Sequence, residues 1–302
     1  MNPGDRRFAC TQCGKCCDRS PEVELGEAAA LADQFVFRLL FRLYRWPRNV
    51  ADYTHAGVPR AQANAEFFET KRLLGAFAAH TYNAKLRSNG KVSEQLCYLT
   101  VSALTLDSGS GACSALNEAR CSIYERRPLA CRSVPLHYSR GPAFAQQELD
   151  AFLATPGYAC ASGPAAPLLL ADGRIADPAL LAARSAALAQ AAADQPWKTA
   201  IVKAMKAGDP NLPSLRDVEA NAQIGAMTTS MRVGWQIACS AGLLNASELR
   251  ALIYAQAAVI ERQLAQPVLA PAARQTLTEM RGEYALALRN YEGGMRCGAQ
   301  QT

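Results

Sequence analysis

The densest apolar pattern in the N-terminal half of the chain runs from about Glu27 to Arg45. Its apolar residues recur every four positions, at Leu31, Phe35, Leu39 and Leu43. Residues four apart lie on one face of a helix, so the pattern predicts a largely buried helix over about residues 27–45. Arg38, Arg42 and Arg45 would then form one stripe, which we interpret as a solvated face rather than an anion contact.

Two further elements follow in this half. Residues from about Ala61 to Leu86 have helical composition, and Ser88 to Gly90 marks a turn. The segment from Leu96 to Leu106 is rich in Tyr, Leu, Val and Thr, which predicts a strand. Val23 and Leu25, after Pro21, indicate a short extended piece.

The C-terminal half begins after a segment dense in Pro and Gly, residues 156–173, and is rich in alanine. Its pattern predicts a series of helices separated by turns near Gly208 and Gly242. The expected helix starts are Asp177-Pro178, Pro196, the Ser214/Asp217 capping box, the Asn245/Glu248 capping box and, for a last helix ending near Tyr291, Pro271.

These elements predict a mainly α-helical protein with a small irregular or β cysteine-cluster region. We expect a metal-binding domain over residues 1–165, with a helical insertion at about 27–90. An alanine-rich helical region would follow over residues 166–302.

Composition narrows the class of protein. The chain has 302 residues, of which 50% are hydrophobic, and these supply ample material for a core. The net charge of +6 is spread along the sequence, which argues against a nucleic-acid arm. The N-terminus carries no apolar leader, and arginines interrupt the most apolar stretch, so we expect a cytoplasmic protein that spans no membrane. Its partner would be a protein or small molecule that the sequence does not identify.

Four of the eleven cysteines lie within eight positions, at Cys10, Cys13, Cys16 and Cys17. Thiolates are soft ligands that hold zinc, copper(I) or iron–sulfur centres. The doubled two-residue spacing is typical of ferredoxin-type iron–sulfur sites, but the next cysteine that such a run supplies is missing here. In a reducing compartment such a dense set favours metal binding over disulfides. These eight residues, 10–17, which we call the octet, therefore supply only half of the ligands of the predicted site.

The second half of the site is predicted at Cys113, Cys121, Cys131 and Cys160. Between two of them, Ser122 and Glu125 match the pattern of a helical turn, and Pro128 suits the first position of another turn beside Cys131. The neighbouring arginines, Arg126, Arg127 and Arg132, offer positive charge to a negative metal–thiolate centre.

These motifs resemble the YkgJ-like cysteine-cluster proteins, a family described as zinc- or iron-chelating. The family motif is a Cys-x-x-Cys-x-x-Cys-Cys run, here residues 10–17. It continues with Cys-x-Ile-Tyr-x-x-Arg-Pro-x-x-Cys-Arg, here residues 121–132, and a late cysteine beside glycines. The resemblance covers roughly residues 8–165. It implies that the eight cysteines ligate metal, and we expect Tyr124, Arg127 and Arg132 to contact the bound cofactor. One related branch, flagellin lysine N-methylase, is thought to use an iron–sulfur cluster in methyl transfer.

The other candidate ligands are assigned structural roles. We interpret Cys97 and Cys239 as buried small hydrophobes and Cys297 as incidental. The chain has three histidines, His55, His80 and His137, so the site must be mainly sulfur-ligated. His137 could support the centre from nearby, although a hydrogen-bonded structural role is favoured.

Three functional hypotheses remain open at this stage. The favoured one is an iron–sulfur protein, of 4Fe–4S type, with a redox or cluster-assisted role. The second is a non-enzymatic interaction module stapled by zinc. The third is a cluster-dependent protein lysine N-methyltransferase, although neither a Gly-x-Gly-x-x-Gly loop nor a Cys-x-x-x-Cys-x-x-Cys loop is found. Enzymatic activity, as an oxidoreductase or a methyltransferase, stays undecided.

Overall fold

The computed structural model describes residues 4–17, 20–45, 50–55, 58–85, 92–104, 106, 112–139, 141–221, 226–267 and 269–292. The strands are β1 Arg6–Arg7, β2 Glu22–Val23, β3 Phe37–Arg45, β4 Ala78–Lys85, β5 Val92–Ala103, β6 Leu116–Asn117, β7 Arg120–Cys121, β8 Leu168–Ala171, β9 Arg174–Ile175 and β10 Met227–Ser230. The helices are α1 Leu25–Ala30, α2 Ala51–His55, α3 Arg60–Phe77, α4 Leu129–Arg132, α5 Ala145–Leu153, α6 Pro178–Ala193, α7 Gln195–Lys206, α8 Leu215–Ala220, α9 Met231–Ser240, α10 Ala246–Leu264 and α11 Pro271–Glu292, with 3-10 turns η1 Tyr124–Arg126 and η2 Pro142–Phe144. The expected class, mainly α with some β, is confirmed.

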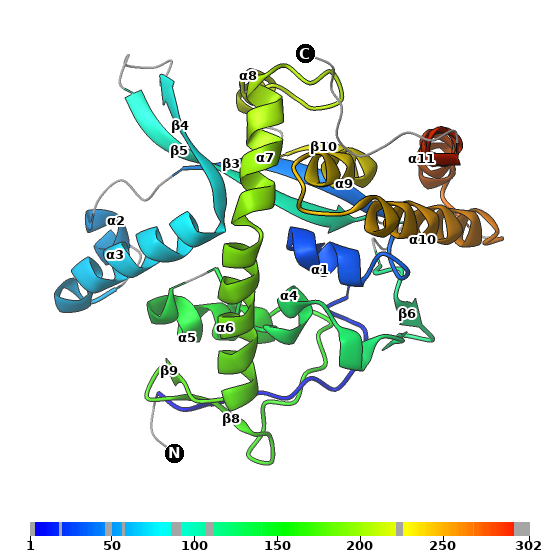
Figure 1. Cartoon of the computed structure of the whole chain (residues 1–302). Coiled ribbons are helices and arrows are strands. Elements are labelled where there is room, and N and C mark those ends of the chain that lie inside the picture. The colour runs from blue at the N-terminus through cyan, green and yellow to red at the C-terminus, as the bar shows by residue number, and fades with distance from the viewer. Residues whose placement is uncertain are drawn as a thin grey trace.

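The largest sheet is antiparallel and has the order β10-β3-β5-β2, with β4 also paired to β5. The long β3–β5 pairing runs from Phe37 opposite Ala103 to Arg45 opposite Gln95. In Figure 1 the helices α6 and α7 form a column in front of this sheet and of the cysteine-bearing segments below it. The sheet and the column together position the site.

The predicted helix over residues 27–45 is wrong. Only α1 is helical there, and Phe37 to Arg45 form β3. Phe37, Leu39 and Phe41 alternate along the strand and are fully buried. The alternation could not be recognised from the spacing of four, because residues four apart lie on the same face of a strand as well as of a helix. The same apolar series therefore fits both structures.

The predicted arginine stripe is also changed by this correction. Arg38 and Arg42 lie on the same face of β3, and Arg42 forms an ion pair with Glu22 of the neighbouring strand β2. That face carries Tyr98 and Thr100 on β5, which line the cavity described below. Arg42 is therefore a cavity residue rather than part of a solvated helix face.

The second predicted helix is partly wrong. Helix α3 ends at Phe77, and Ala78 to Lys85 continue as β4, which pairs with β5. The strand predicted over residues 96–106 is confirmed, and it begins earlier, at Val92. The insertion at about residues 27–90 therefore mixes helices and strands.

One large hydrophobic core covers the face of the sheet opposite the cavity. Phe37, Leu39 and Phe41 of β3 and Leu99 and Val101 of β5 belong to it. The helices contribute Trp197 and Ile201 of α7, Trp235 of α9, Ile253 of α10 and Leu277 and Tyr284 of α11. This core draws on residues from both predicted regions, and the boundary near residue 165 stays a prediction.

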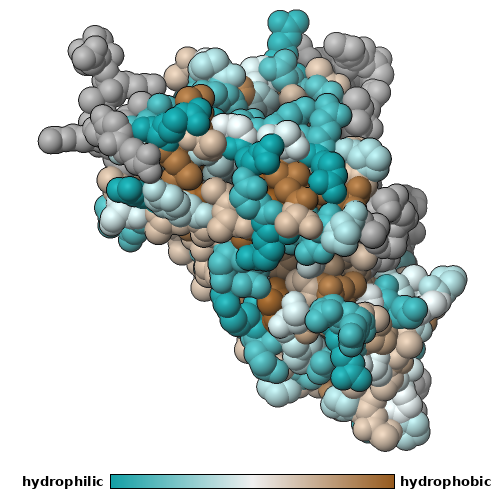
Figure 2. Space-filling view, turned by 90° about the vertical axis from the view of Figure 1, so that its right-hand side faces the viewer, coloured by the Kyte–Doolittle hydropathy of each residue, from teal (hydrophilic) through white to brown (hydrophobic). Residues whose placement is uncertain are grey.

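The C-terminal helices follow the predicted signals. Asp177 accepts a hydrogen bond from the Leu180 amide at the start of α6, and both predicted capping boxes form, at Ser214 and Asn245. Gly208 and Gly242 end helices with positive φ angles of 80° and 73°. Among the described residues, no helix has the length and hydropathy needed to cross a membrane. Figure 2 shows small hydrophobic areas separated by hydrophilic residues on one face.

Candidate metal centre

The start of the cysteine octet is joined to the late cysteine by backbone pairing. Ala9 and Ala161 form an antiparallel bridge with N–O distances of 2.8 and 3.0 Å. The Thr11 hydroxyl donates a hydrogen bond of 2.9 Å to the Ala159 carbonyl. These contacts hold Cys10 next to Cys160 across 150 positions of sequence.

The middle of the octet turns at Gly14, whose φ angle is +70°. A side chain there would overlap the carbonyl oxygen of Ala119. Ala119 belongs to the two-residue turn between β6 and β7, in which both Glu118 and Ala119 have positive φ, as a tight hairpin of this kind requires. Glycine at position 14 therefore lets the octet dock against this hairpin.

The end of the octet is joined to the second cysteine group. The Cys113 amide donates a hydrogen bond of 2.9 Å to the Cys17 carbonyl. Cys121 follows on β7, where it pairs with Leu116, and the Leu116 amide donates to the Cys113 carbonyl. The hairpin thus brings three cysteines of different segments together.

Cys131 lies on the short helix α4. Pro128 is the residue before this helix rather than its first residue, and Glu27 of α1 accepts a hydrogen bond from the Leu129 amide. The predicted turn over residues 122–125 forms as the 3-10 turn η1, but Ser122 donates its hydroxyl to the Ala115 carbonyl and caps no helix. The expected amide donors beside Cys131 are therefore partly used by Glu27.

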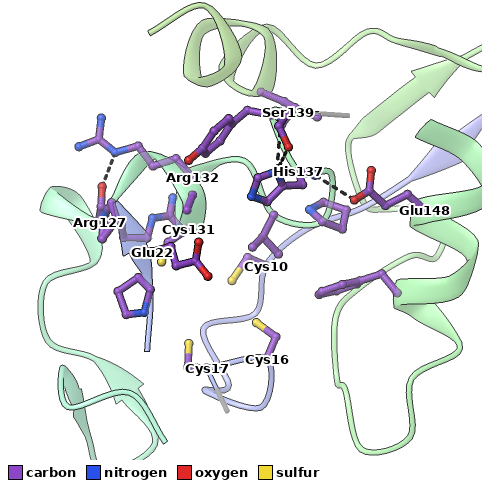
Figure 3. Close-up of a pocket in the computed structure, with 18 of the residues that line it drawn as sticks. Cys10, Cys16, Cys17, Glu22, Arg127, Cys131, Arg132, His137, Ser139 and Glu148 are labelled. Atoms are coloured by element: carbon purple, nitrogen blue, oxygen red, sulfur yellow. Dashed lines mark hydrogen bonds between the residues drawn. The ribbon is translucent and has the colours of Figure 1, made fainter. Parts of the chain in front are cut away.

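All eight predicted cysteines line one cavity of about 950 Å³. They are Cys10, Cys13, Cys16, Cys17, Cys113, Cys121, Cys131 and Cys160. None of these eight cysteines is paired in a disulfide. Figure 3 shows the sulfur atoms of Cys10, Cys16, Cys17 and Cys131 turned toward the same space. Within the described parts of the chain, no group of three or more His, Cys, Asp and Glu side chains is already arranged around one point as a metal site.

Backbone amides donate hydrogen bonds to several of these sulfur atoms, each from the same position relative to its cysteine. The Gln12 amide donates to Cys10 Sγ over 3.4 Å. Hydrogen bonds from the Lys15 backbone and the Thr11 side chain lower the pKa of Cys13, and one from the Ala115 backbone acts in the same direction on Cys113. In each case the amide two residues after the cysteine faces its sulfur. Such hydrogen bonds stabilise thiolates and tune metal–thiolate centres.

Burial and mutual repulsion oppose ionisation elsewhere in the set. Burial, followed by repulsion from Cys113 and Cys121, raises the pKa of Cys131 to about 12. A hydrogen bond with Cys16, burial and nearby thiols raise the pKa of Cys17 well above its ordinary value. Burial raises the pKa of Cys160 to about 11. A cation would remove this repulsion, so the donor set fits a soft metal centre.

The three residues expected to contact the cofactor also line the cavity. The Arg127 guanidinium stacks over the Tyr124 ring at 3.7 Å from its centroid, and its charge favours the thiolate of Cys131. Arg132 donates to the Arg127 carbonyl over 2.8 Å and so positions this segment. Arg126 instead lies against α1, 3.6 Å from Asp33.

His137 lines the cavity, with its ring Nδ1 2.7 Å from the Ser139 hydroxyl. Its backbone amide donates to Glu148 over 3.2 Å, as Figure 3 shows. The structural role favoured for His137 fits this network. The side chains of His55 and His80 lie outside the described parts.

The cysteines outside the cavity behave differently from one another. Cys97 is fully buried, as predicted, and burial raises its pKa to about 11. Cys239 is buried as predicted, but it takes part in a disulfide rather than acting only as a small hydrophobe. Cys297 lies outside the described residues.

Sequence reasoning missed one charged pair at the cavity. Lys198 of α7 donates to Glu24 over 2.7 Å and to the Phe77 carbonyl over 3.1 Å, and both side chains are almost completely buried. Glu24 lines the cavity. Burial raises the pKa of Glu24, although Lys198 acts against this shift. No local signal marks the pair, because its members are 174 positions apart.

The segment that carries these eight cysteines, residues 9–160 and so half of the chain, matches a known family model. The chain belongs to the CxxCxxCC family. Its model is described as a "Putative zinc- or iron-chelating domain". Neither the curated proteins nor the solved structures gave a match to the chain. Membership in the CxxCxxCC family supports metal chelation, of zinc or iron, as the general function.

Proposed function

We propose that this CxxCxxCC-family protein binds an iron–sulfur cofactor of the 4Fe–4S type through the eight cysteines of the cavity. It would use this cofactor in redox or cluster-assisted chemistry. The supporting observation is that eight cysteines from separate segments, none of them paired in a disulfide, line one space of about 950 Å³. A single structural zinc ion needs four ligands and closes its site. Eight thiols around a space of ligand-pocket size leave room for a cluster and for a bound partner.

The charge around the cavity also supports a cluster. Iron–sulfur centres with thiolate ligands are negative, and nearby hydrogen bonds and cations tune their potential. Arg127 supplies such a charge beside Cys131, and the amides of Gln12, Lys15 and Ala115 face sulfur atoms. When bound, the cluster would supply electron transfer, while the chain would hold, shield and tune it.

The proposal includes a cytoplasmic location, because a dense cysteine set in a reducing compartment favours metal binding over disulfides. The competing function is a zinc-stapled interaction module. Methyl transfer stays an expectation of the resemblance to the flagellin lysine N-methylase branch.

Metal analysis of the anaerobically purified full chain tests the proposal. The protein should be brown and contain iron with an equal amount of acid-labile sulfide. Colourless protein with stoichiometric zinc under these conditions would replace the cluster with the zinc module. Arg127→Gln should then shift the midpoint potential of the bound cluster to a more negative value, because a nearby positive charge stabilises its reduced form. Arg126→Gln is the matched control, since Arg126 lies against Asp33.

A further inference from the structure

The eight cysteines divide into two groups by the backbone segments that carry them. Cys10 and Cys160 flank the bridge between Ala9 and Ala161, and the hydrogen bond from Thr11 to Ala159 fastens the same two segments. Cys13 follows one turn later, and the Ala159 backbone also bonds to its sulfur. The early octet and residue 160 therefore form one local unit.

The second group is assembled by different contacts. The Cys113 amide bonds to the Cys17 carbonyl, and the β6–β7 hairpin sets Cys121 beside the segment of Cys113. Cys131 of α4 lines the same cavity, as do its neighbours Ile123 and Pro128 and the β6 residue Leu116.

The labelled sulfur atoms follow the same division. In the view of Figure 3 the sulfur of Cys16 lies below that of Cys10, and the sulfur of Cys17 lies to the left of both, on the side of Cys131.

The two groups meet at the vicinal pair Cys16-Cys17. Cys16 follows Cys13 in the turn of the octet, whereas the backbone of Cys17 is bonded to that of Cys113. The Cys17 amide donates to the Gly14 carbonyl over 3.1 Å, which closes the turn just before the chain leaves toward Cys113. The boundary between the two groups therefore lies between the consecutive residues Cys16 and Cys17.

We propose that the cavity holds two adjacent four-thiol metal centres rather than one. Cys10, Cys13, Cys16 and Cys160 form the first, and Cys17, Cys113, Cys121 and Cys131 form the second. This inference rests on the proposed function for its cofactor, but the division of ligands does not depend on which metal is bound. Four thiolates complete the coordination of a 4Fe–4S cluster or of a tetrahedral zinc ion.

Iron and sulfide counts on the full chain, purified anaerobically, test the division. Wild-type protein should contain about eight iron and about eight sulfide per chain, since each 4Fe–4S cluster holds four of each. Cys160→Ser and Cys131→Ser should each halve both counts. Cys16→Ser combined with Cys160→Ser should lose no more than either alone, whereas Cys160→Ser combined with Cys131→Ser should lose everything. Cys17→Ser should lose the same cluster as Cys131→Ser, so combining these two variants should lower the iron and sulfide counts no further than either variant alone.

The wild-type count keeps the test decisive even where a variant does not fold. A count of about four iron per chain, or loss of all metal in each single variant, would overturn the division while leaving iron–sulfur binding intact. Two zinc ions per chain with the same grouping of variants would support the division and overturn the proposed cofactor. Protein without iron, sulfide or zinc would overturn both.

Discussion

The amide of Cys113 donates a hydrogen bond of 2.9 Å to the carbonyl oxygen of Cys17. This bond ties the end of the octet to a segment almost a hundred positions later. Ligation by both residues would close the same long loop a second time, and metal binding that occurs only in the folded chain adds to stability.

We therefore expect removal of metal to destabilise the whole protein. Anaerobic chelation should lower the melting temperature by about 10 °C, since roughly 3–5 kcal/mol is lost and each kcal/mol is worth about 2–4 °C at this size. Cys13→Ser and Cys121→Ser should each lose about half of the metal and part of the stability that chelation removes, because the two cysteines belong to different proposed centres. Cys97→Ala is the control, because Cys97 is buried outside the cavity and its loss should leave the metal content unchanged. An unchanged melting temperature after complete metal removal would show that the metal centre does not stabilise the fold.

Gly14 provides a test of how the octet docks. Gly14→Ala would introduce a side chain at φ +70° and against the Ala119 carbonyl. We expect a loss of about 3 kcal/mol in the free energy of unfolding and a reduced metal content, because strain and overlap add. Gly157→Ala is the matched control: its φ is +85°, but no atom lies within 4 Å, so only about 1–2 kcal/mol of strain should appear. Urea unfolding and metal analysis of both variants measure the difference. Equal effects would mean that the contact with Ala119 plays no part.

The helices of the C-terminal half could be predicted because their signals are local. Asp177, Ser214 and Asn245 each bond to an amide three residues later, so the sequence contains the whole interaction. Strand β3 could not be predicted in this way. Its identity depends on pairing with β5, more than fifty positions away, and its apolar spacing fits a helix equally well.

The site shows the same contrast. The cysteine spacings carry enough information to predict which thiols converge on one cavity, because short turns fix the geometry of each motif. The proposed division between Cys16 and Cys17 depends on where the segments of Cys113 and Cys160 lie, and tertiary contacts determine that. Glu24 and Lys198 were missed for the same reason, since only the fold brings them together.

Glu27 predicts a specific dependence of stability on pH. Burial, which outweighs its hydrogen bond from the Leu129 amide, raises the pKa of Glu27 to about 7. The folded protein therefore binds this proton more tightly than the unfolded chain. Its contribution, about 3 kcal/mol, is complete below about pH 4.5 and is lost as the pH rises through 7.

Glu27→Gln should remove this dependence, because a neutral amide can still accept from Leu129. Between pH 5 and pH 8 the stability of the variant should rise relative to wild type by up to about 3 kcal/mol in urea unfolding. The exposed Glu125→Gln serves as control. A difference that stays constant over this range would contradict the raised pKa.

Lys198 and Glu24 should couple the C-terminal helices to the metal site. Lys198→Met leaves the Glu24 carboxylate buried without its partner, so we expect a loss of about 3–5 kcal/mol in the free energy of unfolding. Adding Glu24→Gln removes that buried charge and should restore more than half of the loss. Lys203→Met, at an exposed position on the same helix, should change stability by less than about 0.5 kcal/mol. Because Glu24 lines the cavity, Lys198→Met should also lower metal retention during dialysis, and the double variant should regain it. Two losses that simply add in the double variant would show that Lys198 acts through packing alone.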